Sequence, residues 1–208
     1  MKKKLISLLL CGALLCGALA GCSSNSADTS DDSASATSQS EETTKTLTTA
    51  VGAELNTLYP LNMDVQNNIG TKLCYEGLVN YENGEVVPCL AESWEFSDDG
   101  KTLTFHLKEG VTFHDGTAFN AEAVKTDFDF AHPNPNFSNI SAVANVESIE
   151  VVDEYTVAFH YPTAYFAYLL DFCYPETMVL VSPAVLEEGN YQSMNGVVGT
   201  GPYIYDEI

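Results

Sequence analysis

The sequence predicts a mixed α/β fold in which hairpins and short helices alternate along the chain. Between Ala91 and Lys108, large apolar residues alternate with polar ones on both sides of a turn at Asp98-Asp99-Gly100, as in a hairpin with one buried face. Behind Asn120, a typical N-cap residue, apolar residues recur at helical spacing. These residues are Ala121, Val124, Phe128 and Ala131.

Shorter elements are predicted before this hairpin. Residues Thr46–Val51 have the composition of a strand, and Asn68–Tyr75 have the spacing of a short helix. A second hairpin follows, with strands at Leu78–Tyr81 and Val86–Leu90. Its turn, Glu82-Asn83-Gly84-Glu85, contains an Asn-Gly pair, which supports the positive φ angles of a tight hairpin turn.

The same signals predict further elements after the long helix, which Pro133 ends. They are a strand pair at Val146–Val152 and Tyr155–Tyr161, an apolar helix at Tyr165–Cys173, a strand at Val179–Val181, a short helix at Pro183–Glu188 and a final strand after Gly199–Tyr203.

The first 21 residues have the pattern of an export signal. Three lysines, Lys2, Lys3 and Lys4, precede an uncharged stretch of 16 residues, Leu5–Ala20, which is shorter than the ~20 residues of a spanning helix. The sequence Leu19-Ala20-Gly21-Cys22 resembles the lipobox of bacterial lipoproteins. This resemblance implies that residues 1–21 are removed and that Cys22 is lipidated. An ordinary signal peptide and a membrane anchor are the alternatives.

Residues 22–45 are predicted to be a disordered linker. From Ser23 to Thr44 the chain has no aromatic and no large aliphatic residue, so it cannot bury enough apolar surface to offset the entropy of ordering. Residues 46–208 are then the folded part, held away from the membrane by the linker.

The charge of the chain restricts its partners. Eight basic residues face 29 acidic ones, the net charge is −21, and no arginine is present. Nucleic acid and anionic membrane surfaces are therefore poor partners. Cationic or zwitterionic ligands are favoured electrostatically, although solubility alone is the simpler explanation of the charge.

The sequence contains no recognisable catalytic, metal or cofactor motif, so we expect neither an enzyme nor a resident metal or cofactor. Once the leader is removed and Cys22 is lipidated, three cysteines remain without close spacing, at Cys74, Cys89 and Cys173. Among the histidines, His132 is the one expected near a ligand, because it lies in a polar loop, His132-Pro133-Asn134-Pro135-Asn136.

Several sequence blocks carry a resemblance to a known family. They are Tyr75-Glu76-Gly77-Leu78-Val79, the run Val87 to Trp94, the run Ser97 to Phe130 and Gly199-Thr200-Gly201-Pro202-Tyr203. In this order they resemble the solute-binding proteins of peptide and nickel ABC importers, solute-binding protein family 5. The stretches Pro162 to Phe172 and Met194 to Tyr203 are similar to the nickel-binding branch.

The resemblance implies a periplasmic-binding-protein type II-like fold with two lobes. It implies that residues 46–208 are the first lobe only, built of two subdomains with an insert at about 75–180, and that the second lobe is missing. Nickel-binding members place arginines in the cleft to hold a chelate. This chain has none, which places the binding of an anionic chelate in this half in doubt.

The implied function is an exported, lipid-anchored and monomeric receptor on the outer face of the membrane. Its ligand would be an oligopeptide, a dipeptide or a nickel chelate, passed to an ABC permease. A lipid-anchored adhesin or scaffold and a hydrolase without a recognisable catalytic site are the rival hypotheses. The expected ligand-contacting residues lie in two loops. They are Tyr59, Asn62, Met63 and Asn68 in the first, and His132, Asn136 and Phe137 in the second.

Overall fold

The computed structural model describes Pro60 and residues 68–175, 178–189 and 196–206. They belong to a compact unit that spans Thr49–Ile208. The predicted leader, the linker and the strand at Thr46–Val51 lie outside the described residues. The elements are α1 (Asn68–Cys74), β1 (Val79–Glu82), β2 (Glu85–Pro88), β3 (Ala91–Phe96), β4 (Thr102–Leu107), α2 (Ala121–Ala131), the 3-10 helix η3 (Pro135–Phe137), α3 (Ser141–Ala144), β5 (Ser148–Asp153), β6 (Thr156–His160), α4 (Tyr168–Asp171) and α5 (Pro183–Glu188).

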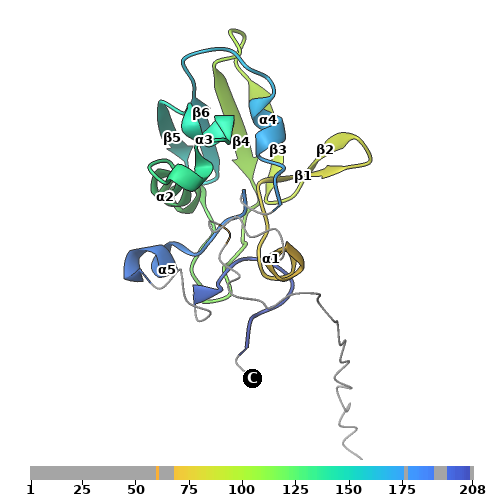
Figure 1. Cartoon of the computed structure of the whole chain (residues 1–208), viewed down its shortest axis with the longest axis vertical. Coiled ribbons are helices and arrows are strands. Elements are labelled where there is room, and N and C mark those ends of the chain that lie inside the picture. The colour runs from red at the N-terminus through yellow and green to blue at the C-terminus, as the bar shows by residue number, and fades with distance from the viewer. Residues whose placement is uncertain (1–59, 61–67, 176–177, 190–195, 207–208) are drawn as a thin grey trace, which may run out of the picture. The chain divides into compact units, whose positions relative to one another are not determined.

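A four-stranded antiparallel sheet with the order β3-β4-β6-β5 forms the centre of this region (Figure 1). Phe105 of β4 pairs with Trp94 of β3 on one side and with Val157 of β6 on the other. The alternation of apolar and polar residues fixes this register, because a shift by one residue would turn the apolar set to solvent. Both predicted strand pairs are therefore confirmed.

Strands β1 and β2 form the separate predicted hairpin. Asn83 and Gly84 at its tip have φ angles of 52° and 92°. This is the left-handed pair of angles that a two-residue hairpin turn requires, and Asn-Gly adopts it at low cost. In Figure 1 the hairpin projects to one side of the sheet.

Helix α2 covers the sheet next to β5 and β6. The Asn120 side chain accepts a hydrogen bond from the backbone N–H of Ala123 at 2.9 Å, which confirms the predicted N-cap. The predicted apolar stripe of the helix is buried. Its Phe128 ring lies 4.9 Å from Phe159 of β6, so the core forms between this helix and the sheet.

The chain crosses itself in a region that we call the junction, defined as residues 73–77, 178–182 and 196–203. Here segments far apart in sequence are joined by backbone hydrogen bonds, from Leu180 N–H to Glu76 at 2.9 Å and from Gly201 N–H to Cys74 at 3.0 Å. A Cβ at Gly199 would overlap the carbonyl oxygen of Cys74. Glycine is therefore required at Gly199 for the close passage of two backbones.

Three predicted elements differ from the structure. The strand at Val179–Val181 is only an isolated bridge between Gly77 and Val179, and no strand follows Gly201 within the described residues. The reason is that Gly201 and Tyr203 bond to the end of α1 instead of pairing with a strand. The helix predicted at Tyr165–Cys173 is shortened to α4, because Phe166 turns toward β3, where its ring packs 4.9 Å from Phe96.

Candidate functional site

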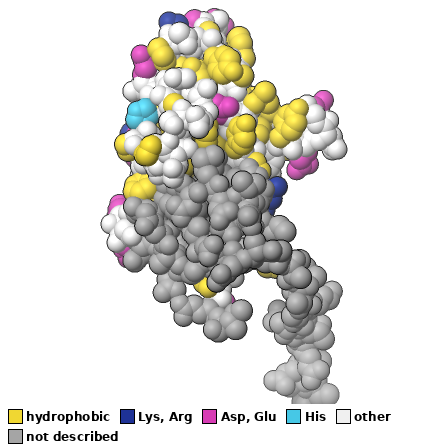
Figure 2. Space-filling view, viewed as in Figure 1, with side chains coloured by type: hydrophobic (Ala, Val, Ile, Leu, Met, Phe, Trp, Pro, Cys, Tyr) yellow, Lys and Arg dark blue, Asp and Glu magenta, His cyan; other side chains and the backbone are white. Residues whose placement is uncertain are grey.

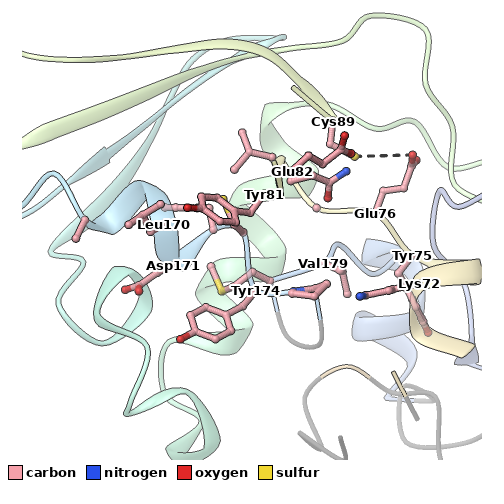
Figure 3. Close-up of a pocket in the computed structure, with 18 of the residues that line it drawn as sticks. Lys72, Tyr75, Glu76, Tyr81, Glu82, Cys89, Leu170, Asp171, Tyr174 and Val179 are labelled. Atoms are coloured by element: carbon pink, nitrogen blue, oxygen red, sulfur yellow. Dashed lines mark hydrogen bonds between the residues drawn. The ribbon is translucent and has the colours of Figure 1, made fainter. Parts of the chain in front are cut away.

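A large cavity of the described residues lies between the start of the β1–β2 hairpin and the α4 segment. Its volume is about 920 Å³. One wall comes from residues 72–82 and the other from residues 165–179, without the two undescribed positions. We call this space the hairpin cavity (Figure 3).

Large side chains line the hairpin cavity without being buried. Tyr81, Leu170 and Tyr174 are 56%, 49% and 54% exposed. Figure 2 shows hydrophobic side chains gathered on the face where α4 and the hairpin lie. Exposed apolar groups that converge on one concavity are typical of a binding surface, whereas single exposed residues carry no such meaning.

The charged lining of the cavity is mostly acidic. Glu76, Glu82 and Asp171 line it, against one cation, Lys72. Two of the carboxylates are held in place. Glu76 Oε2 accepts a hydrogen bond from the Thr200 hydroxyl at 3.0 Å, and Asp171 Oδ2 accepts one from the backbone N–H at the start of α3 at 2.8 Å. Burial raises the pKa of Asp171 above its ordinary value, and the α3 hydrogen bonds offset this in part.

Two thiols also line the cavity. Burial raises the pKa of Cys173 to about 11, so this thiol is neutral at pH 7. The pKa of Cys89 is raised by burial and by the nearby Glu76 carboxylate, whose Oε1 is 3.9 Å from the sulfur. A raised pKa makes a thiol a poor nucleophile and a poor metal ligand. Neither thiol of the lining is therefore prepared for nucleophilic attack.

Within the described residues, Cys74, Cys89 and Cys173 are free thiols, and no cluster of three or more His, Cys, Asp or Glu side chains is placed to hold a metal ion. None of the helices in this part of the chain has both the length and the apolar character needed to cross a membrane.

Four of the predicted ligand-contacting residues are not placed in detail. Tyr59, Asn62 and Met63 lie outside the described residues. Asn68 is the first residue of α1, and its side chain is not described. Their assignment to a ligand site stays a prediction.

The structure places the second predicted loop away from the hairpin cavity. His132 Nδ1 lies 2.9 Å from the carbonyl oxygen of Val143, so that nitrogen carries the proton and donates. Asn136 is exposed on η3, and Phe137 is only 1% exposed in the core. None of these three predicted residues lines the cavity, and their ligand role also stays a prediction.

The residues that line the cavity gave weak signals in the sequence. Tyr81 and Glu82 lie beside the turn of a predicted hairpin, and Tyr174 follows a stretch expected to be an apolar helix. An exposed aromatic residue beside a hairpin turn is the one local signal that points to this surface. Nothing in the sequence indicates that the hairpin faces α4.

The mixed sheet, the crossing segments and an open cavity lined by aromatic and carboxylate side chains suit a protein that binds a small molecule. The family model described as bacterial extracellular solute-binding proteins, family 5 Middle, matches residues 85–208, and this chain belongs to that family. The predicted family is confirmed.

Individual relatives agree with this assignment. The chain is 34% identical over 157 residues to the glutathione-binding protein GsiB of Pectobacterium atrosepticum, covering 74% of this chain and 30% of that protein. It is 30% identical over 167 residues to the nickel-binding periplasmic protein of Escherichia coli K12, covering 74% and 32%. The chain thus spans about a third of the length of these relatives.

A solved structure confirms the predicted fold class. The crystal structure of NikA from Brucella suis in complex with Fe(III)-EDTA matches with a TM-score of 0.64 and 32% sequence identity. The match covers 75% of this chain and 32% of NikA. Residues of the described region are therefore arranged as in part of a periplasmic binding protein of this family.

Proposed function

We propose that this chain is part of an exported, lipid-anchored solute receptor that captures a peptide, glutathione or a nickel chelate and delivers it to an ABC permease in the membrane. The observation that carries the proposal is the family match over residues 85–208. The ligand classes come from relatives whose names state that they bind glutathione or nickel.

The receptor would bind without chemistry. Its ligand would stabilise one arrangement of the whole protein over another, and the population would shift by the difference in binding free energy between the two. The neutral thiols of the hairpin cavity support this part of the proposal, because they leave Cys89 and Cys173 without nucleophilic character.

Anchoring would depend on Cys22. The Leu19-Ala20-Gly21-Cys22 sequence and the polar residues 23–44 support a lipidated N-terminus on a flexible linker. Two acyl chains give stable anchoring, whereas one chain binds a membrane only reversibly. The anchor would keep the receptor close to its permease and raise the effective concentration of each for the other.

Ligand binding and turnover can be tested together on the purified chain. We expect its thermal unfolding temperature to rise with glutathione, with a small peptide or with nickel plus histidine, and the mass of the recovered ligand to stay unchanged. Hydrolysis of the peptide without any thermal shift would contradict the receptor and favour the hydrolase.

Anchoring has its own test. In a bacterial host, the full chain is expected in the membrane fraction, with the mass of its N-terminal peptide increased by lipid. Cys22→Ser should release it from that fraction, while Cys74→Ser, a change at a buried thiol, should leave lipidation intact. Lipid on the Cys22→Ser chain would exclude this residue as the anchor.

A further inference from the structure

The hairpin cavity has the shape and charge to select one kind of ligand. We propose that it receives a small organic cation, with an ammonium or guanidinium head and an apolar body. This inference rests on the proposed function as a solute receptor and names the chemistry that its ligand presents to this surface.

The apolar body would pack against rings that come from two separate walls. Tyr81 belongs to β1, and Tyr174 follows α4, so the two rings enter the cavity from segments that are more than ninety residues apart. Leu170 lies beside them in the view of Figure 3. Each side chain is about half exposed and loses contact with water when a ligand covers it, which favours binding.

The head group is selected by charge. Three carboxylates line the cavity against Lys72, and in Figure 3 Asp171 lies on the left, with Glu76 and Lys72 on the right. The chain has no arginine that could offset this charge. An anionic head would be repelled, while a cation would be attracted by the carboxylates and by the faces of the tyrosine rings.

Glu82 is the carboxylate best placed to respond to a ligand. Glu76 is held by Thr200 and Asp171 by the start of α3, so both have structural partners. In the described part of the chain, the Glu82 carboxylate makes no hydrogen bond or ion pair, and it follows Tyr81 directly at the end of β1. An incoming cation would therefore gain a partner without breaking an existing contact.

The volume limits the ligand to a small molecule. A cavity of about 920 Å³ falls within the roughly 300–1,000 Å³ that is typical of small-molecule sites. Because the rings and the carboxylates line the same cavity, one small molecule can present its body to the rings and its head to the carboxylates.

A matched series of probes tests the charge. The compounds 4-phenylbutylamine, 4-phenylbutanol and 4-phenylbutyrate share one apolar body and differ in a cationic, neutral or anionic head. In NMR titrations of the full chain at fixed ionic strength, the amine is expected to bind at least threefold more tightly than the alcohol, and the acid most weakly. Equal affinity for the amine and the acid would overturn the proposal.

Paired variants test the site. Glu82→Gln should weaken amine binding by roughly two- to fivefold, the effect of one exposed charge, and leave alcohol binding unchanged. The control is Glu85→Gln, since Glu85 pairs with Glu82 across the hairpin and does not line the cavity. Tyr174→Ala removes a ring that packs against the apolar body and should weaken both the amine and the alcohol, the amine at least as much. Equal effects of Glu82→Gln and Glu85→Gln would place the cation elsewhere.

The outcomes separate this inference from the proposed function. If glutathione or nickel-histidine shifts the unfolding temperature but no probe of the series binds, the chain is a receptor and the cation proposal fails. If the amine binds in the expected order but neither glutathione nor nickel-histidine binds, the cation site stands and the proposed ligands fail.

Discussion

On one face of the sheet, four buried phenylalanines from β4, β6, α2 and the end of α4 pack ring against ring, with the centroid of Phe159 5.8 Å from that of Phe105, 4.9 Å from Phe128 and 5.0 Å from Phe172. In the junction, two backbones approach each other so closely that a side chain at Gly199 would overlap the carbonyl oxygen of Cys74. The sheet is thus stabilised chiefly by apolar side chains, whereas in the junction backbone hydrogen bonds join segments that pass too closely for a side chain at Gly199.

Two carboxylates add to this contrast. Asp127 Oδ2 accepts a hydrogen bond from Val181 N–H at 2.8 Å, and Asp115 Oδ2 accepts one from the Ser182 hydroxyl at 2.5 Å. Burial would raise the pKa of Asp115, but the hydrogen bonds from Ser182 and Thr117 outweigh it and keep this pKa below its ordinary value. The returning segment 181–182 is therefore held by side-chain hydrogen bonds in addition to backbone ones.

The largest effect is expected in the sheet. Phe159→Ala removes a ring that is 0% exposed and contacts three other phenylalanines, so it should lower the free energy of unfolding by about 3–5 kcal/mol. Urea denaturation measures the loss. The control is Phe166→Ala, which removes a ring that is 66% exposed and should cost far less. Similar losses for both variants would show that the aromatic cluster does not dominate stability.

The junction should be destabilised when a side chain is added, whereas the sheet is destabilised when one is removed. Gly199→Ala forces the backbone of Cys74 to move and should cost about 1–3 kcal/mol, as overpacking does. It should also speed hydrogen exchange at the N–H groups of Gly201 and Tyr203, which donate to the end of α1. Gly110→Asn is the control, because Gly110 has φ 73° and open space around it, and Asn tolerates this conformation.

An unchanged hydrogen exchange rate at Gly201 in Gly199→Ala would contradict the contrast between the sheet and the junction. It would mean that close backbone approach does not hold the junction together. A large loss in Gly110→Asn would have the same consequence, because the cost would then follow any new side chain on a glycine.

The two regions also differ in how well the sequence predicts them. The sheet and α2 are predicted by the alternation around Trp94 and Phe105 and by the helical stripe that ends at Ala131. In each of these elements the buried face repeats at a fixed spacing, so apolar residues recur at that spacing in the sequence. The junction has no such repeating pattern in its sequence. Its contacts join Cys74 to Gly201 and Glu76 to Leu180 through backbone atoms, which are the same for nearly every residue.

The hairpin cavity follows the same logic. Its walls come from residues 72–82 and from the α4 segment, and only tertiary packing brings Tyr81 and Tyr174 to one surface. The prediction of one apolar helix at Tyr165–Cys173 gave no indication that the rings of Tyr165 and Tyr174 are exposed. The local sequence pattern therefore predicts the segments that line the hairpin cavity but not the cavity itself.

A smaller effect is expected where the sheet region depends on one polar contact. Asn120→Ala removes the acceptor for the Ala123 N–H at the start of α2 and should cost about 1 kcal/mol, the usual value of an N-cap. Asn120→Asp keeps an acceptor and should restore most of the stability, which thermal unfolding would report. A loss for the aspartate variant as large as for alanine would mean that the residue packs and does not cap.

The smallest change in the free energy of unfolding at low pH is expected from Asp127→Asn. This variant should instead change how stability depends on pH. Burial raises the pKa of Asp127 from 3.8 to about 7, against the opposing effect of the Val181 hydrogen bond. A nearby ionisable side chain is that of Tyr75, whose pKa is raised by burial and by the Asp127 charge. The folded protein thus keeps a proton that the unfolded chain releases. The stabilisation from this proton is complete below about pH 3.8 and is lost as the pH rises through about 7.

Asparagine keeps an acceptor for Val181 N–H and carries no charge, so the variant should lose little at pH 5 and gain relative to the natural chain at pH 8. The difference in unfolding free energy between the two chains isolates Asp127, because every other titrating group is common to both. Asp129→Asn, at an exposed residue paired with Lys125, should show no such crossover. A difference that stays constant from pH 5 to pH 8 would mean that Asp127 is ionised in the folded chain throughout, and that the junction tolerates a buried charge.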